Sequence, residues 1–312
     1  MLFIAAGILA ALSVLFPFAC RLFPPLAQGW LQTVFAPLSD VLSTLASPCP
    51  FPLAEPLLLL LAALLLFLLF RARRSACLLL SFLLAGYALM WAPAYSLPAR
   101  YAVGGNVDAA ALAAVCEVLT GRLNTCEGFA LPAGLSAQAL EAARLADTPI
   151  PVHAAPKPAR YPEWMRALSL AGLYVPWTAE AIYDPTAPAA AQPFTAVHEL
   201  MHMGGVADEG QANIYAYIAC QRYGGAFARS ADLWALKYAM EALHAVDADA
   251  WSYCLSALTG AARGAFFAIG GGSPVTVADG DGAVEAFLRL GGIAAQTSNY
   301  GALAAWLAAH IV

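Results

Sequence analysis

The sequence has few charged residues. Only 11% of its 312 residues are Asp, Glu, Lys or Arg, whereas 61% are hydrophobic. A typical soluble domain has about 25% charged and about 45–50% apolar residues. The shortage of charge therefore argues against an ordinary soluble protein and favours a membrane protein. The few basic residues form no stripe, so nucleic acid is not an expected partner.

Three long apolar runs stand out in the first part of the chain. They cover about residues 2–22, 53–70 and 76–92. A helix needs about 20 mostly apolar residues to cross the hydrocarbon core, and roughly 17 are tolerated. We therefore expect a membrane domain over residues 1–99 with three transmembrane helices and the lipid bilayer as a partner. The first run lacks the charged start of a cleaved signal peptide, which favours a retained helix.

Basic residues between the second and third runs indicate the orientation. Arg71, Arg73 and Arg74 form a short loop, and such loops stay in the cytoplasm. Residues 100–312 would then form an extracytoplasmic domain.

Cysteines fit this layout. Six of the seven fall outside the membrane or at its outer face, where disulfides are allowed. Cys116 and Cys126 are close in sequence and are the first expected pair, and Cys220–Cys254 is the second. Free buried thiols are the alternative.

The rest of the chain reads as mostly helical. Helices are expected over residues 106–124, with Asn106 or Asp108 as the cap, and over 136–147, 281–292 and 299–310. Aromatic and β-branched residues between 172 and 185 predict one or two short strands. The expected fold class is therefore mainly α, with three transmembrane helices followed by a mostly helical domain that carries a small β element.

Two of the five histidines are four residues apart, and a glutamate follows the first. On a helix over residues 194–203, His198 and His202 lie on one face and can bind one metal ion. Glu199 lies beside that face, within reach of a metal-bound water. This H-E-x-x-H arrangement is typical of zinc hydrolases, in which zinc lowers the water pKa to about 7 and the glutamate accepts its proton. The alternative is a helix whose histidines only pack or cap.

A catalytic zinc ion also needs a third protein ligand and one open position. The helix should end at Gly204-Gly205, because glycine allows a left-handed turn. Asp208 and Glu209 follow this turn, and the second is expected to begin the next helix. Spacing alone leaves both as candidates for the third ligand.

The residues HELMH and EGQAN resemble the CAAX-prenyl-protease and heat-shock membrane zinc proteases. In those, H-E-x-x-H is followed by E-x-x-A-D, and the leading glutamate binds zinc. Glu209, Ala212 and Asn213 stand at the matching positions, although the linker here is only six residues long.

A closer resemblance covers most of the chain. It is to an uncharacterised bacterial membrane family with three N-terminal membrane helices. The matching segments are CPFPLAEP, GLYVPWTAE (residues 172–180), PFT before the histidines, and SNYG (residues 298–301). The resemblance implies a zincin-like fold in the bacterial cytoplasmic membrane and favours Glu209 over Asp208. Gly210 and Gln211 replace an acidic pair of the family pattern.

Three further residues have two readings each. Asn213, one turn after Glu209, either accepts the second N–H of a zinc-bound histidine or satisfies buried backbone groups. Glu180 either lies on a strand beside the cleft or forms a salt bridge. Tyr300 either donates to the oxyanion of the reaction or packs a C-terminal helix.

The sequence therefore predicts a membrane-anchored zinc metallopeptidase that acts on a peptide or protein substrate. His198, His202 and Glu209 would bind Zn²⁺, Glu199 would be the general base, and Tyr300 is a second catalytic candidate. The alternative is a zinc-binding structural or sensory membrane protein without turnover, which a fourth protein ligand would favour. The sequence gives no expectation for the oligomeric state.

Overall fold

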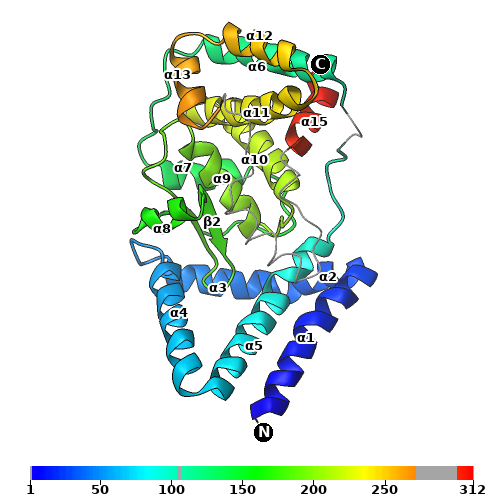
Figure 1. The fold of residues 1–312 in the computed structure, drawn as a ribbon, viewed down its shortest axis with the longest axis vertical. Coiled ribbons are helices and arrows are strands. Elements are labelled where there is room, and N and C mark those ends of the chain that lie inside the picture. Colours follow the sequence, from blue (N-terminus) through cyan, green and yellow to red (C-terminus); the bar gives the residue numbers. More distant parts are fainter. Residues whose placement is uncertain (1, 104–106, 272–300, 312) are drawn as a thin grey trace.

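The computed structural model describes residues 2–103, 107–271 and 301–311. Three helices in this part are long and apolar enough to cross a membrane, namely α1 (Leu2–Leu22), α4 (Ala54–Arg71) and α5 (Arg73–Met90). They extend away from the rest of the chain (Figure 1). The three expected spans are therefore present, which makes this a membrane protein by length and composition.

The third span begins and ends earlier than expected. Helix α5 ends at Met90, and a short 3₁₀ helix, η2 (Ala92–Ser96), follows it. Pro93 has no N–H, so it cannot continue the helix by donating to the carbonyl of Leu89. The Trp30 indole takes that place, with Nε1 donating to this carbonyl at 2.7 Å.

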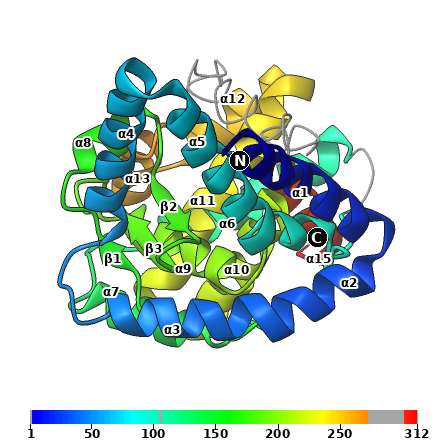
Figure 2. The ribbon, with the colours of Figure 1, turned by 90° about the horizontal axis from the view of Figure 1, so that it is seen from below.

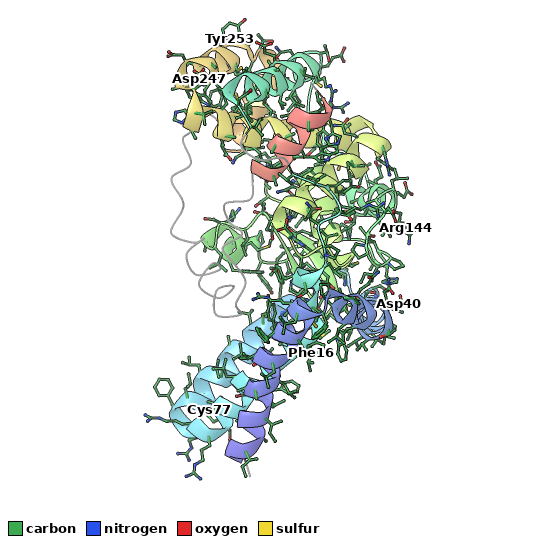
Figure 3. All side chains as sticks on the ribbon, turned by 90° about the vertical axis from the view of Figure 1, so that its right-hand side faces the viewer. Phe16, Asp40, Cys77, Arg144, Asp247 and Tyr253 are labelled. Atoms are coloured by element: carbon green, nitrogen blue, oxygen red, sulfur yellow. The ribbon has the colours of Figure 1, made fainter. Side chains whose placement is uncertain are left out.

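The arginines lie at the end of the span pair that is farthest from the domain. Helices α4 and α5 are joined by one residue, Ala72, so Arg71, Arg73 and Arg74 cluster at this turn. Figure 3 shows Cys77 at the same end of the molecule, with Asp247 and Tyr253 at the opposite end. The arginine cluster and the domain are thus on opposite sides of the membrane spans.

A nearly horizontal helix crosses the base of the domain. It consists of α2 (Pro24–Trp30), a π-helical turn η1 (Leu31–Phe35) and α3 (Ala36–Ala46). Figure 2 shows it along one side of the molecule when seen from below. The segment connects the end of α1 to the start of α4.

The domain is built from packed helices. The long helices α6 (Ala109–Asn124) and α11 (Gly225–Val246) pack against each other, and α12 (Ala248–Ala257) and α13 (Gly260–Ala268) cover their far side. Helix α7 (Leu135–Ala143), α9 (Gln192–Met203) and α10 (Glu209–Tyr223) form the part nearer the membrane, and α15 (Gly301–His310) packs on α10 and α11. The expected cap is present, because Asp108 accepts from Ala111 N at 2.7 Å.

The β element is a sheet of three short strands in the order β1-β3-β2. Strand β1 (Lys157–Pro158) is parallel to β3 (Glu180–Tyr183), and β2 (Gly172–Val175) is antiparallel to it. Both strands expected between residues 172 and 185 are therefore present. Helix α8 (Pro162–Ala167) lies in the connection before β2, and α9 packs against β2 and β3.

The expected disulfides Cys116–Cys126 and Cys220–Cys254 are both wrong, because all seven cysteines are free thiols. Cys116 lies within α6 and Cys126 beyond its end, and eight helical residues alone separate them by about 12 Å. A disulfide needs Cα atoms about 4.4–6.8 Å apart. Cys254 contacts Cys116 instead of Cys220: the Cys116 thiol hydrogen-bonds to it, which raises the pKa of Cys116 and lowers the pKa of Cys254.

Two expectations fall on residues that the structure does not describe. The helix over residues 281–292 and the catalytic candidate Tyr300 both lie between 272 and 300. Both therefore stay predictions.

Candidate metal centre

Helices α9 and α10 meet at a tight turn that the sequence indicates. Helix α9 ends at Met203 with Gly204 as its C-cap, and Gly205 has φ +84, a value that favours glycine. Asp208 then caps α10, its Oδ1 accepting from Gln211 N at 2.7 Å. This geometry makes Glu209 the first residue of α10 and directs it toward α9.

The side chains of His198, His202 and Glu209 converge. Nε2 of His198 lies 3.1 Å from Nε2 of His202 and 3.1 Å from Oε2 of Glu209. Nε2 of His202 lies 3.4 Å from Oε1 of Glu209. A tetrahedral zinc ion with bonds of about 2.1 Å separates its ligand atoms by about 3.4 Å. The three side chains therefore fit a metal of this size without rearrangement.

A backbone contact fixes the orientation of His202. Its Nδ1 donates to the carbonyl of Val206 at 2.7 Å, in the turn between the two helices. In the neutral ring this leaves the lone pair on Nε2, which faces the other two side chains. Histidine ligands in metal sites are commonly held in this way.

Of the two acids after the turn, the structure brings Glu209 and not Asp208 to the histidines. Asp208 is occupied as a helix cap. Among the described residues the potential ligands within 4.8 Å of one another are His198, His202 and Glu209. The Glu209 side chain is 37% exposed, so the cluster is reachable from outside.

Glu199 lies beside the cluster in a buried position. It packs against Gly172 at the start of β2, where a Cβ would lie 2.6 Å from Cγ of Glu199. In the metal-free protein burial raises the pKa of Glu199 to about 7, and the two histidines only partly oppose this effect. Glu199 is therefore poised to exchange a proton near neutral pH.

The three converging side chains share charge in the metal-free state. Burial lowers the pKa of His202, but the charge and hydrogen bond of Glu209 outweigh it and raise the pKa to about 9. Burial opposes ionisation of Glu209, but His202 and His198 hold the pKa of this carboxyl well below its usual range. In the metal-free protein a protonated His202 therefore supplies the positive charge next to the Glu209 carboxylate.

Aromatic side chains from the end of the third membrane helix line the cluster. The Trp91 ring lies edge-to-face on His202 with centroids 6.1 Å apart, and it also contacts Tyr174 of β2 at 5.1 Å. The charge of Glu209 contributes to the raised pKa of Tyr95. Nothing in the local sequence pattern indicates this contact between Trp91 and His202.

The hydrogen bond proposed for Asn213 is not formed in this structure. Both polar atoms of the Asn213 side chain, and Nδ1 of His198, are buried without a partner. Asn213 lies one helical turn after Glu209 and on the same face of α10. That Asn213 accepts a hydrogen bond from a zinc-bound histidine therefore stays a prediction.

Glu180 lies away from the cluster and forms a salt bridge, the second of its two readings. Its carboxylate accepts from Leu53 N at 3.0 Å, from Ala54 N at 2.8 Å and from Lys157 Nζ at 2.8 Å. It thereby caps the first turn of membrane helix α4.

Gln211 also has a structural explanation. Its Oε1 accepts from Tyr101 N at 3.0 Å, and its Nε2 donates to Tyr101 O at 2.9 Å. A glutamate at position 211 could not donate the second bond. The amide therefore holds the connection between η2 and α6 against α10.

Comparison with known proteins gives a family but no function. The family described as "Protein of unknown function (DUF3810)" matches residues 30–266. No curated protein and no solved structure matches the chain. The matched segment covers most of the sequence and includes helices α9 and α10 of the candidate metal centre, so the chain belongs to this family of unknown function.

Proposed function

We propose that this chain is a membrane-anchored zinc metallopeptidase. The observation that carries the proposal is the convergence of two imidazole Nε2 atoms and one carboxylate, beside a buried Glu199. His198, His202 and Glu209 would bind the metal. Among the described residues no fourth His, Cys, Asp or Glu joins them, which supports an open position and hence catalysis.

The metal supplies Lewis acidity when bound, polarising a peptide carbonyl and lowering the pKa of a water molecule to about 7. Glu199 would take a proton from the attacking water and transfer it to the leaving amine. In the metal-free protein burial raises the pKa of Glu199 to about 7, and a nearby dication would favour the ionised form that accepts a proton.

Strand β2 supports the binding of an extended peptide. It is an edge strand of the described sheet, and its first residue, Gly172, touches Glu199. A substrate segment that pairs with such an edge would pass its backbone beside the proposed base. The zincin-like fold that the sequence suggests uses the same principle.

We further propose that the domain is extracytoplasmic in the bacterial cytoplasmic membrane. Arg71, Arg73 and Arg74 lie at the turn between α4 and α5, on the side of the spans away from the domain. Because short arginine-rich loops stay in the cytoplasm, this arrangement supports a domain on the other side.

The substitution Glu199→Gln tests the function. We expect zinc content to be kept and hydrolysis of a denatured polypeptide to fall by roughly 10²–10⁴-fold, the usual contribution of a general base. Glu163→Gln, at an exposed position of α8, is the matched control and should leave the rate unchanged. A fully active Glu199→Gln variant would contradict the mechanism. A zinc-loaded wild-type protein that hydrolyses nothing would favour a non-catalytic zinc protein.

A further inference from the structure

The helix at the base of the domain must run along the membrane surface. Only Phe23 separates the end of α1 from α2, and α4 begins at Ala54. No span lies between α1 and α4 in the described chain, so the end of α1 and the start of α4 are on the same side of the bilayer. The helix formed by residues 24–46 connects these two points (Figure 2). We call it the surface helix.

The surface helix has an apolar face that the protein does not cover. Its buried face, including Leu31 and Phe35, joins the core of the domain. A second row of apolar side chains recurs every three or four residues and is exposed: Val34 38%, Leu38 40%, Val41 55% and Leu45 70%. Asp40 is the one charged residue between positions 22 and 54. A helix with this pattern beside its own membrane spans is suited to the bilayer surface.

The metal centre is held directly on these membrane elements. Trp91 follows the last residue of α5 and contacts His202, and its ring centroid also lies 6.0 Å from that of Phe35 in the surface helix. Trp91 is buried in the same core as the residues of α9 and α10. One side chain thus separates a metal-ligand candidate from the end of a membrane span.

Two buried carboxylates hold the sheet to the start of α4. Glu180 of β3 caps α4 and pairs with Lys157 of β1. In return, Glu55 in the first turn of α4 accepts from the backbone N–H groups of Arg160 and Tyr161 at 3.0–3.2 Å. We call this arrangement the carboxylate clamp. It fixes the sheet, and with it the strand that touches Glu199, relative to the membrane.

We propose that the metal centre works at the bilayer surface on polypeptides anchored in the same membrane, and cuts them close to their membrane segment. The surface helix would place its apolar row at the boundary between the lipid headgroups and the acyl chains, and so set the height of the metal centre above the bilayer. The substrate class rests on the proposed peptidase function, whereas the position of the surface helix does not.

A cleavage experiment tests the substrate class. The full-length zinc-loaded protein is reconstituted in phosphatidylcholine–phosphatidylglycerol vesicles with a probe that has one transmembrane segment and a flexible stalk of serine, alanine and leucine. We expect cuts roughly five to ten residues from the membrane segment, which corresponds to about 17–35 Å of extended chain. The same stalk without its anchor should be cut about ten-fold or more slowly, because anchoring raises its effective concentration.

Each outcome of this experiment is decisive. Cuts spread evenly along the stalk, or equal rates with and without the anchor, would overturn the proposed substrate class and leave the peptidase function standing. No cleavage of either probe would overturn the peptidase function and the substrate class together.

A second measurement tests the surface helix without relying on activity. Benzoylphenylalanine at position 45, in the exposed apolar row, should photo-cross-link to lipid acyl chains in the same vesicles. At position 44, a polar exposed position on the same helix, lipid cross-linking should be at least several-fold weaker. Equal or absent lipid cross-linking at both positions would overturn the placement of the helix.

Discussion

The candidate metal centre and the carboxylate clamp both contain buried acidic side chains, but the hydrogen bonds to these side chains differ. In the clamp, Glu55 accepts from two backbone N–H groups and from the Trp164 indole, and Glu180 accepts from two backbone N–H groups and a lysine. In the metal centre, no hydrogen bond to the Glu199 carboxylate is found in the described part of the chain. The unpartnered atoms of His198 and Asn213 lie in the same region.

The difference in hydrogen bonding indicates that the carboxylates of the clamp have a structural role. A buried charge is costly unless hydrogen bonds and opposite charges surround it, as they do in the clamp. The candidate metal centre instead brings three potential ligand atoms together beside Glu199. Buried groups with shifted pKa values, such as Glu199 and His202, are typical of functional sites.

The largest expected effect is a difference in the free energy of unfolding between a variant of the clamp and a variant of the candidate metal centre. Glu180→Ala removes the charge partner of the buried Lys157 and the cap of the first turn of α4, so we expect the free energy of unfolding to fall by about 3 kcal/mol. Glu199→Gln removes no hydrogen bond found in the described part of the chain and replaces a carboxyl whose ionisation burial opposes, so it should not lower the free energy of unfolding. Urea unfolding in detergent micelles measures the free energy of unfolding of both variants. Equal losses would mean that Glu199 is structural as well.

The next effect concerns the space that Gly172 leaves for Glu199. Gly172→Ala places a Cβ against the Glu199 side chain and should displace it, lowering kcat by about 10²-fold with zinc content unchanged. Gly121→Ala, in α6 with nothing within 4 Å, is the control and should be neutral. Unchanged kcat in Gly172→Ala would show that the position of Glu199 is unimportant for the reaction.

Asn213 provides a smaller test. If its side chain orients a zinc-bound histidine, Asn213→Ala should weaken zinc binding by about 10–100-fold. Asn124→Ala removes two hydrogen bonds far from the metal centre and should leave zinc affinity unchanged. Competition with a chelator measures both affinities, and equal affinity in the two variants would assign Asn213 to packing only.

The smallest expected effect is the release of a proton when zinc binds. His202 has a pKa of about 9 in the metal-free protein, above its ordinary value, so it is protonated at neutral pH. A metal must displace this proton, so zinc binding should strengthen as pH rises from 6 to 8 and release about one proton. Titration calorimetry in buffers of different ionisation enthalpy counts it. A binding constant independent of pH would contradict the assignment of His202 as a ligand.

The local parts of the centre could be predicted from the sequence. The spacing of His198 and His202 places them on one helix face, and Gly204-Gly205 ends that helix at the expected residue. Glu209 begins the next helix as expected. The three membrane spans were equally readable, because long apolar runs have few alternative structures.

Contacts between distant segments could not be predicted. The clamp joins Glu55 to residues more than 100 positions away, and Trp91 reaches His202 from another element. Such contacts have no sequence period, and Trp91 has the same local pattern as any aromatic residue at a membrane interface. The predicted disulfide between Cys116 and Cys126 was wrong for a related reason. The two residues are close in sequence, but the helix between them holds them apart in space.

The most direct test of the central claim is the position of zinc itself. Anomalous X-ray scattering at the zinc edge, from crystals of the metal-loaded full-length protein, would locate it. We predict one strong peak bonded to Nε2 of His198, Nε2 of His202 and the carboxylate of Glu209, with a fourth ligand that is not a protein side chain. A peak elsewhere, or a fourth protein ligand that closes the site, would contradict the proposed enzyme.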